Sequence, residues 1–302
     1  MASSMLDYPA LAAIAAVVRE GSFERAAETL GITPSAVSQR VRGYEERIGT
    51  ILIVRGQPCA ATDLGRRLCA HFDRVRLLEA DLAPALAPAG AAAPVTVRVA
   101  VNADSLATWF PQAAADFARR TGMLLDLILD DEAHTADRLR SGEVLAAVTA
   151  DPEPVPGCRT VRLGALRYAA CAAPGFFRRH FAAGVDAASL AAAPRMRFDR
   201  RDFLQLRWAR EAHGLDLAAP VHWVPSTQGF LDFALAGLAW GMQPVALAQP
   251  HLAAGRLVEL PPGRQVAVEL HWTVARLHAP PLRALTDAVR RQAAAMIEPA
   301  TG

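Results

Sequence analysis

Apolar residues recur at helical spacing in three stretches near the start of the chain, and they predict three short helices. The first covers residues 9–20, with its inward positions at Leu11, Ile14, Val17 and Val18. The second follows Ser22 and ends at Gly31, where a left-handed residue closes a helix. The third starts at Thr33 and Pro34, a cap followed by proline, and repeats its apolar positions at Val37, Val41, Tyr44 and Ile48.

The outward face of the third helix carries short hydroxyls, an amide and guanidinium groups, which bind phosphates and read base edges. A face that is only solvated is the alternative. A short apolar run at residues 51–54 follows and ends at Arg55, so three helices plus a wing predict a winged helix-turn-helix. The expected DNA contacts are Thr33, Pro34, Ser35, Ser38, Gln39, Arg40, Arg42 and Arg55.

A heptad pattern comes next and predicts a linker helix that begins at Thr62 and Asp63. Its inward positions, which include His71, are spaced by four or three residues, and the expected dimerisation seam is Leu64, Leu68, Val75, Leu78 and Leu82. A helix docked on its own effector domain is the alternative. Pro84 and Pro88 end the seam, and residues 85–94 have no periodicity, which indicates a domain boundary.

Strand and helix patterns alternate from Val95 onward. Expected strands cover residues 95–101, 124–129, 144–149, 168–172, 196–198, 221–224, 257–260 and 266–274, with a short strand at Met242. Expected helices cover residues 105–120, 135–140, 203–211, 227–239 and 281–297, with others within 176–192. This order predicts an α/β fold with a parallel sheet and helices on both faces.

Length, charge and cysteine content limit the classes of function that this chain can have. A chain of 302 residues is long enough for two domains, and the net charge is only +2. Residues 31–76 nevertheless hold eight Arg against four acids, as a DNA-binding end would. The four Cys and eight His form no ligand cluster, so we expect neither a metal nor another cofactor.

Targeting and catalytic patterns are absent from the sequence. There is no run of about eighteen apolar residues and no basic leader, so we expect a cytoplasmic protein with no membrane partner. No nucleotide-binding, nucleophile-elbow or metalloprotease motif is found either. We therefore do not expect an enzyme.

Several of these motifs resemble one known family. Gly21-Ser22-Phe23, Ala26-Ala27, Ala36-Val37-Ser38, Gly49 and Arg55 look like the signature of the LysR-type transcriptional regulators. Residues 33–40 and 54–59 are closer still to its arginine- and lysine-export regulator branch. The resemblance implies linker helices that pair in a homodimer, a tetramer of two dimers, and double-stranded operator DNA and RNA polymerase as partners.

The resemblance also implies a division of the chain into three parts. These are a winged helix-turn-helix over residues 5–62, a linker helix and connector over 63–90, and an effector-binding domain over 91–302. The last part would be two-lobed and periplasmic-binding-protein-like. Lobe 1 would hold residues 95–166 and 268–302, and lobe 2 residues 167–267.

Ligands of two-lobed sensors sit between the lobes, where strand ends and helix N-termini meet. Ser105 is expected to cap a helix whose free N–H groups suit a carboxylate, although Asp104 and Ser105 could serve only as caps. Asp130-Asp131-Glu132 crowds carboxylates at a strand end and requires a cation or full solvation. Residues 199–202 form another such edge. The expected effector contacts are Asp104, Ser105, Thr108, Trp109, Asp130, Asp131, Thr149, Ser226 and Thr227.

These groups fit a basic amino acid, which is the ligand class that the branch resemblance implies. The helix N-terminus at Ser105 would take the carboxylate, Asp104 the α-ammonium group, and Asp130 or Asp131 a cationic side chain. Such a regulator would control an amino-acid exporter or metabolic gene in response to Lys or Arg. The alternatives are a different small organic acid as effector, or a non-regulatory amino-acid-binding protein.

Overall fold

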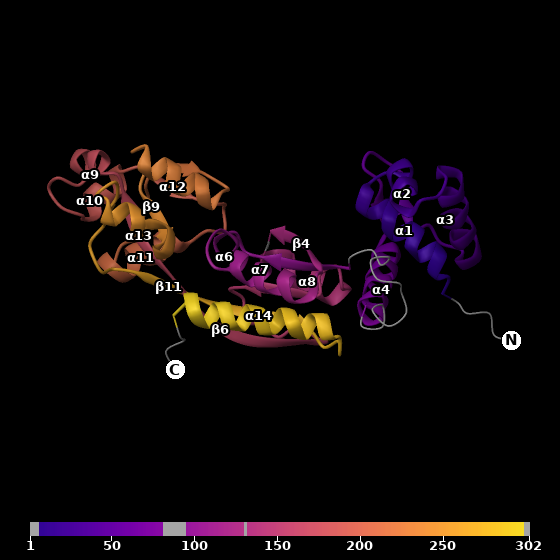
Figure 1. Ribbon diagram of the computed structural model, residues 1–302. Coiled ribbons are helices and arrows are strands. Elements are labelled where there is room, and N and C mark those ends of the chain that lie inside the picture. The colour runs from indigo at the N-terminus through magenta and orange to yellow at the C-terminus, as the bar shows by residue number, and fades with distance from the viewer. Residues whose placement is uncertain (1–5, 81–94, 130–131, 299–302) are drawn as a thin grey trace.

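The computed structural model describes residues 6–80, 95–129 and 132–298. Figure 1 shows a small helical unit at the N-terminal end and a longer body of strands and helices that holds the rest of the chain. Within the body, α12 and β9 belong to the lobe at one end, while α7, α8 and β4 belong to the lobe nearer the helical unit.

The helical unit is built from α1 (Tyr8–Glu20), α2 (Phe23–Leu30) and α3 (Pro34–Ile48), as the apolar spacing predicted. Thr33 caps α3, because its side chain accepts a hydrogen bond from the backbone N–H of Ala36. Gly31 ends α2 with a φ of 63°, a left-handed conformation that favours glycine. Residues from all three helices share one core, which includes Leu11, Ile14, Ala26, Ala27, Val37, Val41 and Tyr44.

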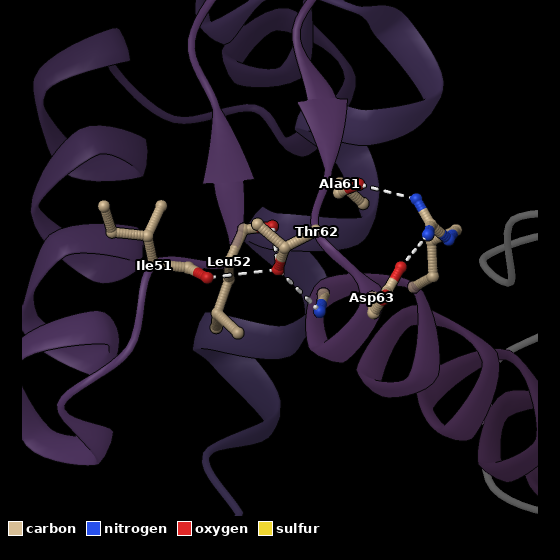
Figure 2. A network of polar contacts seen from close by, with 7 residues as sticks. Ile51, Leu52, Ala61, Thr62 and Asp63 are labelled. Atoms are coloured by element: carbon tan, nitrogen blue, oxygen red, sulfur yellow. Dashed lines mark hydrogen bonds and ion pairs between the residues drawn. The ribbon is translucent and has the colours of Figure 1, made fainter.

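A short wing joins this unit to the linker helix. Strands β1 (Ile53–Val54) and β2 (Ala60–Ala61) pair antiparallel, and α4 (Asp63–Glu79) follows directly. Figure 2 shows the junction, in which the Thr62 hydroxyl lies 3.0 Å from the Ile51 carbonyl and 3.3 Å from the Leu52 carbonyl. The same oxygen accepts from the backbone N–H of Gly65, so one threonine ties the wing to the first turn of α4.

The linker helix packs on both domains of its own chain. Leu64 and Leu68 pack against the core of the helical unit, whereas Leu77 is buried in the core of lobe 1 and lobe 2. Val75 is half-buried and Leu78 is 42% exposed, while Leu82 lies outside the described residues. Two residues of the predicted seam thus pack within their own chain, Leu77 beside the seam packs on the effector domain, and the pairing of linker helices stays a prediction.

Lobe 1 is organised on the strands β3 (Thr96–Val101), β4 (Leu124–Leu129) and β5 (Ala146–Thr149), which are parallel to one another. The predicted parallel pairing holds for these three strands, but the long strands β6 (Cys158–Ala172) and β11 (Val266–Ala275) join antiparallel, so the sheet as a whole is mixed. Helices α6 (Ala103–Ala107), α7 (Phe110–Thr121), α8 (Glu132–Ser141) and α14 (Pro280–Met296) complete this part.

Lobe 2 continues from the second half of β6, which pairs with β9 (Gly241–Pro244) and β10 (Val258–Glu259). Strands β7 (Arg195–Arg197) and β8 (Val221–Trp223) form a parallel pair beside β9. The helices of this lobe are α9 (Pro174–His180), α10 (Ala187–Ala192), α11 (Leu204–His213), α12 (Thr227–Leu235) and α13 (Val245–Ala253). Strands β6 and β11 therefore connect the two lobes.

Three element predictions need correction. Strand β6 spans fifteen residues, whereas only 168–172 was expected. The helix expected over 105–120 is two helices, α6 and α7, because the chain breaks at Thr108 and Trp109. Helix α13 was not predicted, since it contains Pro250, a residue that normally argues against a helix interior.

Candidate functional site

The face of α3 opposite the core carries the predicted DNA contacts. Ser35, Gln39, Arg40 and Arg42 are exposed and Ser38 is half-buried. Within the described part of the chain, no hydrogen bond or ion pair engages the Gln39, Arg40 or Arg42 side chain. These donors are therefore available to an external partner, as base and phosphate contacts require.

Other predicted DNA contacts have a mainly structural role. The Thr33 hydroxyl caps α3 and also lies 3.0 Å from the Ser35 hydroxyl. Pro34 is the first residue of the helix. The Arg55 guanidinium, at the wing, lies over the Phe23 ring at 5.1 Å from its centroid. Arg55 thus sits beside the start of α2 and remains exposed.

A cavity of about 240 Å³ opens between the two lobes of the body. Its lobe 1 side is formed where β3, β4 and β5 end, at Asn102–Asp104, Leu129 and Ala150. This is the place where ligands bind in open α/β sheets, outside the carboxyl ends of parallel strands. The other walls are lined by Tyr168, Phe198, Asp199, Arg201, Asp202, Leu204, Gln205, Thr227, Phe230, Met242, Pro244 and Val268.

Asp104 holds the two lobes together across this cavity. Its carboxylate accepts a hydrogen bond from the Tyr168 hydroxyl and another from the Thr227 hydroxyl, each at 2.6 Å. Burial raises the pKa of Asp104 above its ordinary value, and the two hydroxyl bonds act in the opposite direction. The three residues come from the first turn of α6, from β6 and from the first residue of α12.

The carboxylates on the lobe 2 wall have different partners. Asp202 accepts hydrogen bonds from the backbone N–H of Phe198 at 2.9 Å and from that of Leu204 at 3.0 Å. Asp199 accepts from the backbone N–H of Arg201 at 2.7 Å and lies 3.5 Å from its guanidinium. N–H donors thus compensate the lobe 2 acids, whereas the described partners of Asp104 are hydroxyls.

Ser105 does not have the predicted role. The side chain of Asn102 caps α6 by accepting from the backbone N–H of Ser105 at 3.2 Å. The Ser105 side chain is fully buried and accepts from Trp109 Nε1 at 3.0 Å. The prediction that Ser105 caps a helix for a ligand carboxylate is wrong, because the helix starts two residues earlier and leaves Ser105 in its interior.

The predicted effector contacts differ in their position relative to the cavity. Only Asp104 and Thr227 line the cavity, while Ser226 caps α12 and Thr108 donates to the carbonyl of Asp104 at 2.6 Å. Trp109 and Thr149 are buried beside the cavity without lining it. Asp130 and Asp131 lie outside the described residues.

Sequence reasoning missed most of the apolar lining. Phe198, Phe230, Met242 and Val268 have the spacing of ordinary core residues, so nothing in the pattern separates them from the lobe cores. Residues 199–202 were expected at a ligand edge, and Asp199, Arg201 and Asp202 do line the cavity. Tyr168 was placed on a strand, but its contact with Asp104 depends on the fold.

Other kinds of site are not evident in the parts of the chain that the structure describes. No group of three His, Cys, Asp or Glu side chains in these parts could hold a metal ion. All four cysteines are free. A search of the described helices finds none with the length and apolar character needed to cross a membrane.

Comparison with known proteins identifies both halves of the molecule. Residues 9–66 match the model of the bacterial regulatory helix-turn-helix protein, lysR family, and residues 90–294 match that of the LysR substrate binding domain. The chain belongs to the LysR family. It is therefore a DNA-binding transcriptional regulator and not an enzyme, with a winged helix-turn-helix and a two-lobed, periplasmic-binding-protein-like effector domain.

Similar LysR-family proteins cover nearly the whole chain. The HTH-type transcriptional regulator ArgP of Pseudomonas aeruginosa is 45% identical over 286 residues, which cover 94% of each chain. The HTH-type transcriptional regulator LysG of Mycobacterium tuberculosis is 42% identical over 299 residues, 98% of this chain and 96% of that protein. The expected resemblance to the arginine- and lysine-export branch is confirmed.

Solved LysR-family structures show the same architecture. The crystal structure of ArgP from Mycobacterium tuberculosis has a TM-score of 0.78 at 40% identity and covers 97% of this chain and 99% of that chain. Full-length LysG from Corynebacterium glutamicum with bound effector Arg has a TM-score of 0.69 at 37% identity, with 97% and 100% covered.

Proposed function

We propose that this regulator senses a basic amino acid, Lys or Arg, in the cavity between its lobes. The observation that carries the proposal is Asp104, a carboxylate in the cavity wall whose described partners are two hydroxyls. The LysG of Corynebacterium glutamicum, 37% identical, binds Arg as its effector, which supports the same ligand class here.

The physical argument is one of charge compensation. A carboxylate that loses part of its water needs a cation or strong donors, and hydroxyls compensate it less than an ammonium or guanidinium group would. The cationic side chain of Lys or Arg supplies that charge, while an amino acid with a neutral side chain leaves the carboxylate uncompensated unless its α-ammonium group takes that place. A small organic acid would add a second negative charge next to Asp104, so the cavity disfavours it.

The DNA-binding domain would convert effector binding into a change in transcription. We propose that Gln39 and Arg40 on α3 read bases, and that Ser35, Ser38, Arg42 and Arg55 bind phosphates. Residues 5–62 would bind the operator, the linker region 63–90 would pair in a homodimer that doubles to a tetramer, and residues 91–302 would bind the effector. Effector binding would then change transcription by RNA polymerase, in the cytoplasm, of an amino-acid exporter or metabolic gene.

Calorimetry with the full-length protein tests the effector proposal. We expect binding of L-lysine or L-arginine, and no comparable binding of L-leucine or a dicarboxylic acid. Asp104→Asn should weaken the basic amino acids by about ten- to a hundredfold, the value of a hydrogen bond to a charged group. Asp232→Asn, an exposed acid on α12, is the matched control and should leave the affinity unchanged.

Two outcomes would refute the proposal. Preferential binding of an organic acid would show that the cavity serves a different ligand class. Equal affinities of wild type and Asp104→Asn for L-arginine would show that the Asp104 carboxylate does not receive the ligand cation.

A further inference from the structure

Lobe 2 contains a buried cation that the site described so far does not use. Arg195, on β7, is 5% exposed, and its Nε and Nη1 atoms have no hydrogen-bond acceptor among the described residues. No salt bridge of the described residues includes it. Burial of a guanidinium group without a carboxylate partner costs folding free energy. We therefore expect Arg195 to interact with a negative charge that lies elsewhere.

The strand register places Arg195 behind the lobe 2 wall of the cavity. Arg195 forms a parallel bridge with Trp240, and Met242, two residues further, lines the cavity. Residues two apart on a strand share a face of the sheet, so Arg195, Trp240 and Met242 point to the same side. Gln205 of α11 also lines the cavity and is buried, and its Oε1 atom has no donor among the described residues.

The charge of Arg195 reaches the cavity wall. Burial is the main cause that lowers the pKa of Arg195, the neighbouring Arg197 adds to it, and Asp202 opposes it. Arginine stays protonated under such shifts. Asp202 itself lines the cavity, so Arg195 and the wall are within electrostatic range of each other. In a poorly solvated region such a charge acts over a longer distance than it would in water.

The cavity is therefore polarised. Asp104 makes the lobe 1 edge negative. On the lobe 2 wall, N–H donors compensate Asp199 and Asp202, and the guanidinium groups of Arg201 at the surface and of Arg195 behind it add positive charge. We propose that Arg195 orients the effector, drawing its α-carboxylate toward lobe 2 while Asp104 receives the cation. This inference rests on the proposed basic amino-acid effector and adds a specificity: Arg195 distinguishes an amino acid from the amine that lacks its carboxylate.

Agmatine, which is arginine without the carboxylate, makes this specificity measurable. Calorimetry of the full-length protein gives the ratio of the L-arginine and agmatine affinities. We expect wild type to prefer L-arginine and Arg195→Met to reduce that preference about tenfold, mainly through weaker L-arginine binding. Arg200→Met removes one exposed guanidinium from the same segment and should change the ratio less than about twofold, since an exposed charge is screened.

Folding of the variants is controlled separately. Arg195→Met replaces an unpartnered buried charge by an apolar side chain of similar length, so its unfolding temperature should equal or exceed that of wild type. Arg195→Lys keeps the charge without the guanidinium and should retain the preference for L-arginine. A role limited to packing would instead leave the ratio the same in all three variants.

The outcomes separate the two proposals. If wild type binds neither L-lysine nor L-arginine, the basic amino-acid effector is refuted and the orientation by Arg195 with it; if it binds L-lysine alone, L-lysine and cadaverine replace L-arginine and agmatine in the same comparison. If wild type binds L-arginine but Arg195→Met keeps the wild-type ratio, or Arg195→Lys loses it as fully as Arg195→Met does, only the role of Arg195 is refuted.

Discussion

At the scale of single residues, Asp104 links ligand binding to the closure of the cleft. It joins the first turn of α6 to Tyr168 and to Thr227 at the start of α12, so a ligand cation that binds it also acts on both lobes. Its position between a predicted strand and a predicted helix suggested Asp104 as a ligand contact, but its two hydroxyl partners are 64 and 123 residues away along the chain. No local pattern could have identified them.

The raised pKa of Asp104 gives a prediction for stability. The folded protein binds this proton more tightly than the unfolded chain, whose ordinary pKa is 3.8. Ionisation therefore costs stability as pH rises from 3.8 through the raised pKa of the folded state. Asp104→Asn, which cannot ionise, should unfold at a higher temperature than wild type at pH 7 without ligand, and the difference should shrink as pH falls toward 4. A constant difference across this pH range would contradict the account.

Base reading by α3 is tested by single substitutions. Gln39→Ala and Arg40→Ala should each cost about 1 to 3 kcal/mol on the operator, with little loss on random DNA, because they remove contacts to base edges. Arg47→Ala, at the other end of α3 where Arg47 pairs with Asp7, is the control and should keep the specificity ratio. Fluorescence anisotropy with the operator and with random DNA measures the two affinities and therefore their ratio. Equal weakening on all sequences would assign Gln39 and Arg40 to phosphates instead.

At the scale of elements, the linker helix lies so close to the wing that the addition of one methyl group tests their contact. A Cβ at Gly65 would overlap the Leu52 carbonyl, whereas a Cβ at Gly43 of α3 would meet nothing within 4 Å. Gly65→Ala should destabilise the DNA-binding domain by about 1 to 3 kcal/mol. Gly43→Ala should stabilise it by up to about 1 kcal/mol, since alanine favours a helix. Thermal unfolding distinguishes them, and equal effects would show that α4 does not press on the wing.

Pairing of linker helices gives a second prediction at this scale. Leu78 is 42% exposed, so Leu78→Arg should cost little in the monomer but should place a charge inside a paired seam and shift the protein toward monomers. Leu238→Arg, at a leucine that is 48% exposed in lobe 2, is the control for added charge. Light scattering at micromolar concentration measures the mass. An unchanged mass for Leu78→Arg would remove Leu78 from the proposed seam.

The sequence pattern predicted most elements but not their pairing. The helices of the DNA-binding domain and strand β4 lie where the spacing put them, because caps, Gly31 and an apolar run are local signals. The first part of β6 was missed because Arg159, Arg162 and Gly164 interrupt its apolar run. The antiparallel entry of β11 depends on pairing with residues of β6 that lie far away along the chain, which no local pattern contains.

At the scale of the whole molecule, the central claim is that a basic amino acid in the effector cavity changes binding of α3 to a specific DNA site. The linker helix α4 connects the two, since Leu64 and Leu68 pack on the DNA-binding domain and Leu77 on the effector domain. We therefore assign to α4 the connection between the effector domain and the helix-turn-helix.

The most direct test is selection of genomic DNA fragments by the purified full-length protein, with sequencing, in the presence and absence of L-arginine or L-lysine. The account predicts fragments that share a two-fold symmetric site, with an occupancy or footprint that changes with L-arginine or L-lysine and not with L-leucine. Fragments without a common sequence, or a common site whose occupancy and footprint no basic amino acid alters, would contradict it.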